Sequence, residues 1–232
     1  MVKRFISGLI FCSTGLGLFA AEQWQFVDTQ GELNKRHEAA FVENEGKFYL
    51  MGGRRIQPVD ILDPETNTWS HGSEPPVEIH HFQPVSYKGL IYFICAMTGP
   101  FPNEKGLPYI YTYNPKTDTW AKGDPIPEDR IRGSAGVVLY QDKFYIVAGI
   151  LNGHIDGWVN WVDEYDPNTG KWRKLLDAPR ARDHFQAAVV GDKLYALAGR
   201  RSSHKTGQSF HLTISQVDVL DLKSETWSTL PS

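Results

Sequence analysis

A segment of about fifty residues recurs four times along this chain, and it constrains the fold more than any other feature. In one copy an apolar run, Asp142–Gly149, leads to Val-Asp-Glu-Tyr-Asp-Pro at 162–167 and then to a tryptophan. The tryptophans that end the four copies are Trp69, Trp120, Trp172 and Trp227. Short strand-like runs and turns repeated with this period predict a β-propeller, in which each repeat forms one four-stranded blade.

The motif inside each copy resembles the kelch repeat. A pair of small residues follows an apolar run at Gly52-Gly53, Ala148-Gly149 and Ala198-Gly199, and Asp-Pro or Asn-Pro then stands five residues before the tryptophan in the first three copies. The resemblance covers roughly residues 36–231 and implies an all-β, kelch-type β-propeller. It does not imply one function, because kelch propellers serve as enzymes, lectin-like binders and protein-docking platforms.

The rest of the chain is organised around these repeats. Residues 1–21 are predicted to be a signal peptide, and residues 22–35 a lead-in strand that contains Trp24. Residues 36–232 are predicted to form four blades, with bounds at about 36–78, 79–129, 130–180 and 181–232. Glycine, proline and aromatic residues are spread evenly through them, as expected of short strands and turns.

The strand count predicts a ring that does not close by itself. Trp24 resembles the tryptophan of an outermost strand, yet no further strands follow Trp227 to complete its blade. The first and last blades are then expected to expose apolar faces, including Phe41, Leu220 and Leu222. A truncated reading frame, a partner chain or missing segment that completes the ring, and a strained four-bladed closure are the alternatives, of which we favour truncation.

The N-terminal residues predict export from the cytoplasm. Lys3 and Arg4 precede an apolar stretch, Phe5–Phe19, and the small residues Ala20 and Ala21 follow it. The protein is therefore expected to be secreted or periplasmic, with no stable membrane span once the signal is removed. A membrane anchor is the alternative for this stretch. Removal of the signal leaves Cys95 as the one cysteine, so no internal disulfide is expected.

The charge of the chain argues against one class of partner. The formal net charge is −3 at pH 7. Proteins that bind nucleic acid usually carry a basic patch or stripe, and no run of like charges is present here. Nucleic acid is therefore excluded as a predicted partner.

Two sets of polar residues predict a ligand-binding face. One set lies between the last strand of one blade and the first strand of the next. The other set follows the small-residue pair after the second strand of a blade. In a propeller both places open on the same face, at the mouth of the central channel. Arginine supplies a fork of donors suited to carboxylates, so the expected ligand is a glycan or peptide that is acidic or polyhydroxylated. The predicted ligand-binding residues are Arg36, His37, Arg54, His81, Arg132, Trp158, Arg182, His184 and Arg200. The alternative for the arginines is pairing with neighbouring acids, and for Trp158 packing within its own loop.

Known catalytic motifs are missing from the sequence. It contains no His-Glu-x-x-His, no Gly-Lys-Ser/Thr phosphate loop and no Gly-x-Ser-x-Gly. His80 and His81 are expected on opposite faces of a strand, so no metal site and no cofactor are predicted. A copper radical oxidase would need a Tyr–Cys cross-link, whereas Cys95 is expected to be a small buried apolar residue. Binding without catalysis is the prediction; a kelch-type sialic-acid epimerase or galactose-oxidase-like enzyme, and a protein-interaction platform, are the alternatives.

Overall fold

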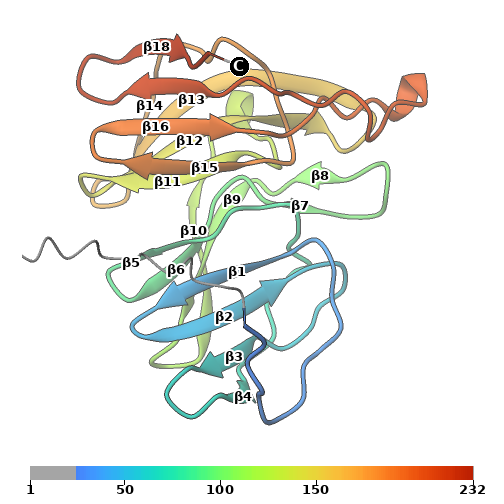
Figure 1. The fold of residues 1–232 in the computed structure, drawn as a ribbon, viewed down its shortest axis with the longest axis vertical. Helices are drawn as coiled ribbons and strands as arrows, with labels where there is room; N and C mark the ends of the chain where they lie inside the picture. Colours follow the sequence, from blue (N-terminus) through green and yellow to red (C-terminus); the bar gives the residue numbers. More distant parts are fainter. Residues whose placement is uncertain (1–24, 232) are drawn as a thin grey trace, which may run out of the picture.

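The computed structural model of this chain describes residues 25–231. They form four antiparallel sheets of four strands, one from each sequence repeat (Figure 1). The predicted all-β propeller blades are therefore confirmed. The predicted signal peptide and Trp24 lie outside the described residues. Of the lead-in segment, Gln30 pairs in parallel with Thr68 at the outer edge of the first blade.

The strands of each blade run in order from the centre of the propeller outwards. The first blade contains β1 (Ala39–Asn44), β2 (Lys47–Gly52), β3 (Asp60–Asp63) and β4 (Thr68–His71). The second contains β5 (Val85–Tyr87), β6 (Leu90–Phe93), β9 (Tyr109–Asn114) and β10 (Thr119–Pro125). The third contains β11 (Gly136–Tyr140), β12 (Lys143–Asn152), β13 (Asp156–Asp166) and β14 (Lys171–Lys174). The fourth contains β15 (Gln186–Val190), β16 (Lys193–Leu197), β17 (Asp218–Asp221) and β18 (Thr226–Thr229).

Smaller elements lie between these strands. A short hairpin, β7 (Met97–Thr98) and β8 (Lys105–Gly106), interrupts the second blade, and two 3-10 turns, η1 (Glu128–Arg130) and η2 (His204–Thr206), follow later. The segment around Trp158, a residue expected to lie in a loop, instead extends β12 and β13 into a long hairpin whose tip lies between Asn152 and Asp156. Strand pairing continues there because Ile150 and Trp158 are partners across the hairpin.

The turn after the third strand of each blade is fixed by one side chain. Asp63, Asn114, Asp166 and Asp221 each accept a hydrogen bond from the backbone N–H two residues later, at 2.9 to 3.0 Å. Such a bond stabilises a turn without help from the rest of the protein. The repeated Asp-Pro and Asn-Pro signals of the sequence therefore mark the ends of the third strands.

The small-residue pair after the second strand brings the backbone close to the residues that lead into the first strand of the same blade. Gly149 has φ of 120°, and a Cβ placed on it would lie 2.7 Å from the carbonyl oxygen of Gly133. Gly53 and Gly199 make the same approach to the carbonyl oxygens of His37 and Asp183. Glycine is required because any side chain would meet immobile backbone and would also strain φ.

Gly149→Ala is accordingly expected to lower the free energy of unfolding by about 2 kcal/mol, through backbone strain and steric overlap. Urea denaturation measures this change. Gly191→Ala is the matched control for strain alone, because Gly191 has φ of 59° and open space around its Cβ position. Equal effects of the two substitutions would contradict the role of the close approach.

Three buried apolar clusters join successive blades. They lie between the first and second, the second and third, and the third and fourth blades. Cys95 is fully buried in the second of these interfaces, as predicted, and burial raises the pKa of its thiol to about 11. Leu220 and Leu222, expected to be exposed, are instead buried against the third blade. Both residues lie on the face of the fourth blade that packs against the third blade.

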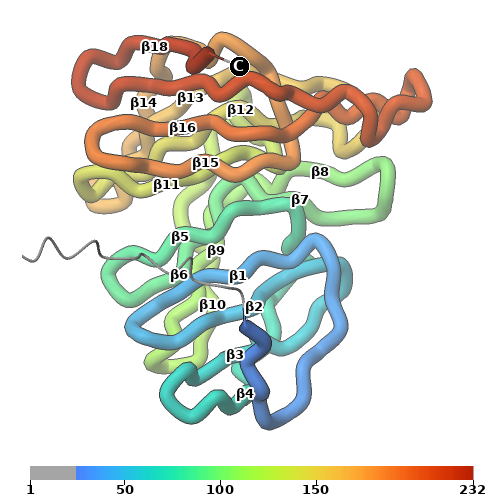
Figure 2. Tube along the Cα trace, in the orientation of Figure 1, coloured from blue at the N-terminus to red at the C-terminus, as the bar shows by residue number. Residues whose placement is uncertain are grey.

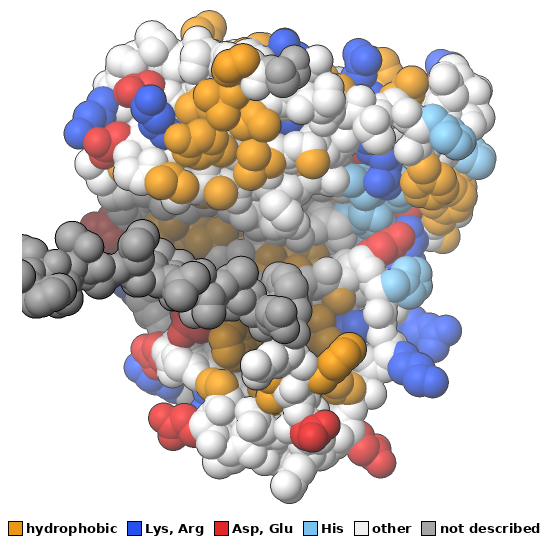
Figure 3. Space-filling view, in the orientation of Figure 1, with side chains coloured by type: hydrophobic (Ala, Val, Ile, Leu, Met, Phe, Trp, Pro, Cys, Tyr) orange, Lys and Arg blue, Asp and Glu red, His pale blue; other side chains and the backbone are white. Residues whose placement is uncertain are grey.

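The opposite faces of the first and fourth blades are less well covered. Phe41 is 53% exposed, as predicted, and stacks only on Phe48 at 5.1 Å between ring centroids. Val190 is 66% exposed on the fourth blade. No buried apolar cluster of residues 25–231 joins the fourth blade to the first, and Figure 3 shows a cleft between the two halves of the molecule. The four described blades thus share three apolar interfaces.

Candidate functional site

The connections between second and third strands lie on one side of the molecule. Figure 2 shows the β2–β3 connection, the β7–β8 hairpin, the tip of the β12–β13 hairpin and the segment around η2 together at one end of the blades. The residues that lead into the innermost strands lie at this end too, as the sequence predicts. Loops carried by a rigid scaffold commonly provide binding sites.

One position of the repeat, which holds Glu, His, Ser and His in the four copies, forms the centre of the site. The residues are Glu38, His81, Ser134 and His184, and all four have a left-handed backbone with φ between 51° and 57°. A non-glycine residue with positive φ is uncommon and tends to occur where the chain must be held in a special shape. Here it marks the turn into each innermost strand, and all four residues line one pocket.

The pocket has a volume of about 390 Å³ and is shared by all four blades. The residues after the left-handed positions, among them Phe82 and Phe185, also line it. Phe101 from the β7–β8 hairpin and Phe210 from the segment after η2 contribute apolar surface and are 45% and 58% exposed. The result is a concave site with an aromatic rim and several polar groups, the usual composition of a ligand pocket.

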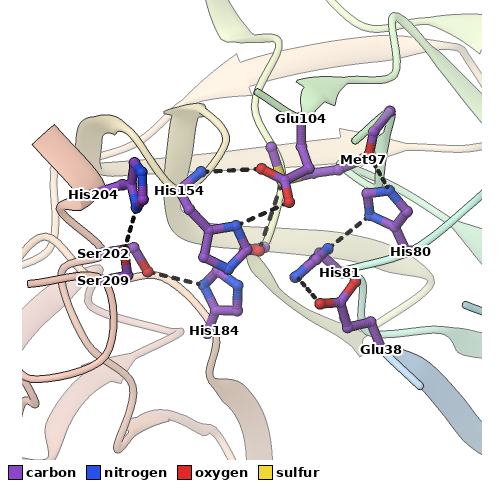
Figure 4. Close-up of polar contacts among 12 residues, drawn as sticks. Glu38, His80, His81, Met97, Glu104, His154, His184, Ser202, His204 and Ser209 are labelled. Atoms are coloured by element: carbon purple, nitrogen blue, oxygen red, sulfur yellow. Dashed lines mark hydrogen bonds and ion pairs between the residues drawn. The ribbon is translucent and has the colours of Figure 1, made fainter. Parts of the chain in front are cut away.

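Three imidazoles from three blades lie together in this pocket (Figure 4). The ring centroids of His81, His154 and His184 are 4.5 to 5.1 Å apart. His81 and His154 are buried, and the His184 side chain is 13% exposed. Burial, together with the neighbouring histidines, lowers the pKa of His81 to about 2. Burial also lowers the pKa of His184, despite its contact with Asp183. These two imidazoles are therefore neutral at pH 7.

His80 and His81 do not lie on opposite faces of a strand, contrary to the prediction. The left-handed backbone at His81 breaks the alternation, and the two Nδ1 atoms are 2.7 Å apart. His80 is fully buried and its Nε2 donates to the carbonyl oxygen of Gly99 at 3.1 Å. The adjacent pair thus forms one hydrogen-bonded unit.

A buried carboxylate, that of Glu104, is hydrogen-bonded to one histidine of the cluster. Glu104 Oε1 accepts a hydrogen bond from His154 Nδ1 at 3.0 Å and also contacts Arg54. Burial alone would raise the pKa of Glu104, but these two partners hold that pKa well below its usual range. Arg54 also contacts Glu38 and donates to the carbonyl oxygen of Gly99 at 2.8 Å. It therefore joins the first blade to the β7–β8 hairpin.

Arg200 is the predicted arginine that lines the pocket. Its Nε donates to Ser202 Oγ at 3.0 Å, and its guanidinium carbon lies 5.0 Å from the ring centroid of Phe210. Within the described part of the chain its terminal nitrogens have no hydrogen-bond partner. Arg200 therefore offers two donor groups to a ligand.

Arg36, Arg132 and Arg182 do not form the rim that the sequence predicts. Their side chains are at most 2% exposed, and each guanidinium pairs with an aspartate on the third strand of its own blade. The partners are Asp60, Asp163 and Asp218, and further donors bind backbone carbonyl oxygens of the second strand or of the segment that follows it. A guanidinium whose donors are used inside a blade contacts no ligand, so these residues stabilise the blades.

Two further predicted residues lie outside the pocket. His37 is exposed beside it, with its side chain 72% exposed. Trp158 lies in β13, where its indole N–H donates to the carbonyl oxygen of Ser202 at 2.9 Å and Arg201 lies over its ring. Of the predicted residues, His81, His184 and Arg200 are therefore the ones that line the pocket.

Sequence reasoning missed His154, Glu104, Phe101 and Phe210. His154 was visible in a long connection but was not assigned to the site. Glu104 had no signal, because a single glutamate in a Pro- and Gly-rich segment is ordinary. Their convergence depends on how the β7–β8 and β12–β13 hairpins fold over the channel mouth.

Comparisons with known proteins agree with this architecture. The kelch motif family matches residues 131–175 and 181–232, which are the third and fourth blades. Kelch-like protein terF of Aspergillus terreus is 26% identical over 99% of this chain and 54% of its own length. The third and fourth blades are kelch repeats. Kelch repeat and BTB domain-containing protein 8 of Homo sapiens is 30% identical over 58% of this chain and 21% of its own length.

A solved structure shows the same fold. The structure of YjhT superposes on 88% of this chain and 67% of its own chain, with a TM-score of 0.73 and 14% identity. At this identity the likeness concerns the fold alone. The chain spans about half the length of terF. It spans about a third of Kelch-like protein 35 of Mus musculus and about a fifth of Kelch repeat and BTB domain-containing protein 8.

Proposed function

We propose that this kelch propeller is a binding protein whose pocket takes a small acidic, polyhydroxylated ligand, such as an acidic sugar or the acidic end of a peptide. The pocket supports this because it combines aromatic surface from Phe101 and Phe210 with polar groups from Gln186 and Ser134. Sugars bind to sites of this kind through stacking on aromatic faces and hydrogen bonds to hydroxyl groups.

The uncommitted donors of Arg200 are the observation that carries the proposal. Burial lowers the pKa of this guanidinium, although an arginine keeps its charge at neutral pH. Glu38 also lines the pocket, but it contacts Arg54 and so its charge is partly balanced. A ligand carboxylate placed against Arg200 would form charge-assisted hydrogen bonds, which are about twice as strong as neutral ones.

Isothermal titration with N-acetylneuraminate, lactose and a Gly-Glu dipeptide tests the proposal. The acidic probes are expected to bind and the neutral sugar to bind much more weakly. Arg200→Ala should weaken binding of the acidic probe by about 1–3 kcal/mol, or roughly five- to 150-fold. Arg201→Ala is the matched control, since the Arg201 side chain lies over Trp158 rather than in the pocket. Equal binding of all probes, or equal effects of both substitutions, would contradict an acid-binding site.

A protein-interaction platform is the second candidate. The exposed rings of Phe101 and Phe210 stand at the open end of the pocket and favour a partner that covers this face. Large aromatic residues at the centre of an interface are frequent hot spots. If a protein partner covers this face, Phe210→Ser should abolish its capture, whereas Arg201→Ala should not.

We also propose that the protein is exported. The basic start, apolar run and small residues of positions 1–21 support this. Among residues 25–231, no helix is long and apolar enough to cross a membrane. Mass spectrometry of the exported protein is expected to find an N-terminus near Ala21 or Glu22. An intact Met1 on cytoplasmic protein would contradict export.

A further inference from the structure

The hydrogen bonds around the three imidazoles fix which ring nitrogen of each carries the proton. His154 Nδ1 lies 3.0 Å from a carboxylate oxygen of Glu104, and His184 Nδ1 contacts a carboxylate oxygen of Asp183. An ionised carboxylate only accepts, so both Nδ1 atoms must donate. In the neutral form of either ring, Nε2 therefore carries the free lone pair.

The same reasoning applies to His81 through its neighbour. His80 Nε2 must donate to the carbonyl oxygen of Gly99, so His80 Nδ1 has no proton when the ring is neutral. His80 Nδ1 then accepts from His81 Nδ1, 2.7 Å away. This leaves His81 Nε2 as a third free lone pair, and it lies 3.4 Å from Glu38 Oε1, another acceptor. Two hydrogen-bond acceptors at this distance repel each other unless a cation or a proton lies between them.

One of these lone pairs, that of His184, has no partner among residues 25–231. The Nε2 atom that carries it is buried. A buried polar atom without a partner costs about 1–3 kcal/mol. The fold nevertheless places this ring beside His81 and His154, and each of the three rings is oriented by a hydrogen bond at its Nδ1 atom.

We propose that His81, His154 and His184 form a site for a divalent transition-metal ion, with Zn²⁺ as the expected occupant. Each histidine offers a ring nitrogen, and these nitrogens all lie within 4.8 Å of one another. Zn–N bonds of about 2.0–2.1 Å in a tetrahedral site require nitrogens roughly 3.4 Å apart, so only a small closure is needed.

The surroundings match a metal site. Metal-bound histidines usually donate their other ring N–H to a carboxylate or carbonyl group, and Glu104 and Asp183 provide such acceptors for two of the three. Neutral imidazole suits Zn²⁺ and its neighbours in the transition series. The three rings line an open pocket, so a fourth ligand position would face the pocket.

Titration of the untagged, EDTA-treated and desalted full chain with Zn²⁺ alone tests the site. We expect saturable binding of one ion per chain, a higher Tm on Zn²⁺ addition, and at least a hundredfold loss of affinity in His154→Ala and His184→Ala. The exposed residues His37 and His211 supply controls, and His37→Ala and His211→Ala should bind Zn²⁺ like the wild type. Because the probe is the metal alone, this inference goes beyond the proposed function and does not rest on it.

A second readout keeps the test independent of variant folding. Co²⁺ bound to the wild type should give the intense visible absorption of a four-coordinate nitrogen-rich site, and Zn²⁺ should displace it. Circular dichroism identifies any variant that has failed to fold, and such a variant is replaced by His184→Gln. Absence of saturable Zn²⁺ binding in the wild type, weak octahedral Co²⁺ bands, or unchanged affinity in the folded variants would overturn the proposal.

Discussion

Arg132→Ala is expected to lower the free energy of unfolding by about 3–5 kcal/mol, as loss of one partner from a buried ion pair usually does. Arg132 is fully buried, and its NH1 lies 2.9 Å from Asp163 Oδ2. Its Nε donates to the carbonyl oxygen of Ala148 at 2.6 Å. The substitution would leave Asp163, which is 1% exposed, with Arg130 as its remaining cationic partner.

The second blade suggests a rescue for this variant. There Ile79 replaces the arginine and Tyr111 the aspartate, and both are buried in the apolar interface between the first two blades. Arg132→Ile combined with Asp163→Tyr should therefore recover much of the lost stability, since apolar pairs often replace buried ion pairs at little cost. Urea denaturation of both variants, with the exposed His37→Ala as control, measures the difference. A double variant less stable than Arg132→Ala would contradict this account.

Acid is expected to destabilise the third blade through Glu164. Burial alone would raise the pKa of this carboxyl, but hydrogen bonds from Arg173, Lys143 and Tyr145 lower that pKa from 4.5 to about 2. Because the pKa is depressed on folding, the stabilisation is complete above about pH 4.5 and is lost as the pH falls towards 2. For a side chain that is 7% exposed, with the half-exposed Arg173 as partner, it amounts to about 2–3 kcal/mol.

Glu164→Gln isolates this contribution. The variant should be less stable than the wild type at pH 7, and the gap should close as the pH falls below about 4.5. Glu65→Gln, at an exposed turn, should follow the wild type at every pH. A gap that stays constant between pH 7 and pH 2 would show that Glu164 acts by packing rather than by charge.

Most of the fold was predictable from the repeats. The spacing of the tryptophans and the Asp-Pro turns located all four blades, because each signal fixes a strand end through local physics. The hairpin at 150–160 was missed, since Asn152, Gly153 and Gly157 are typical of a loop and the pairing depends on neighbouring strands. The exposure of Leu220 was also misjudged, because strand alternation alone does not tell which face meets a neighbour.

The candidate site was only partly predictable. Aligning the repeats located His81 and His184, whose shared left-handed backbone brings them to the channel mouth. The same alignment misplaced the arginines, although the sequence holds a signal for their true role. Wherever Arg precedes the first strand, Asp occupies the matching position of the third strand, and where Ile79 replaces Arg, Tyr111 replaces Asp. Paired substitution of this kind indicates contact inside a blade.

Nuclear magnetic resonance mapping of a titration with N-acetylneuraminate tests the central claim, that the four left-handed junction residues form the functional pocket. The account predicts the largest backbone amide shifts at Glu38, His81, Ser134 and His184, with Arg200 beside them. Small shifts are expected at the opposite end of the blades, for example at the turn residues Asn67 and Asp118. Saturable shifts confined to those turns, with none at the junction residues, would contradict the account.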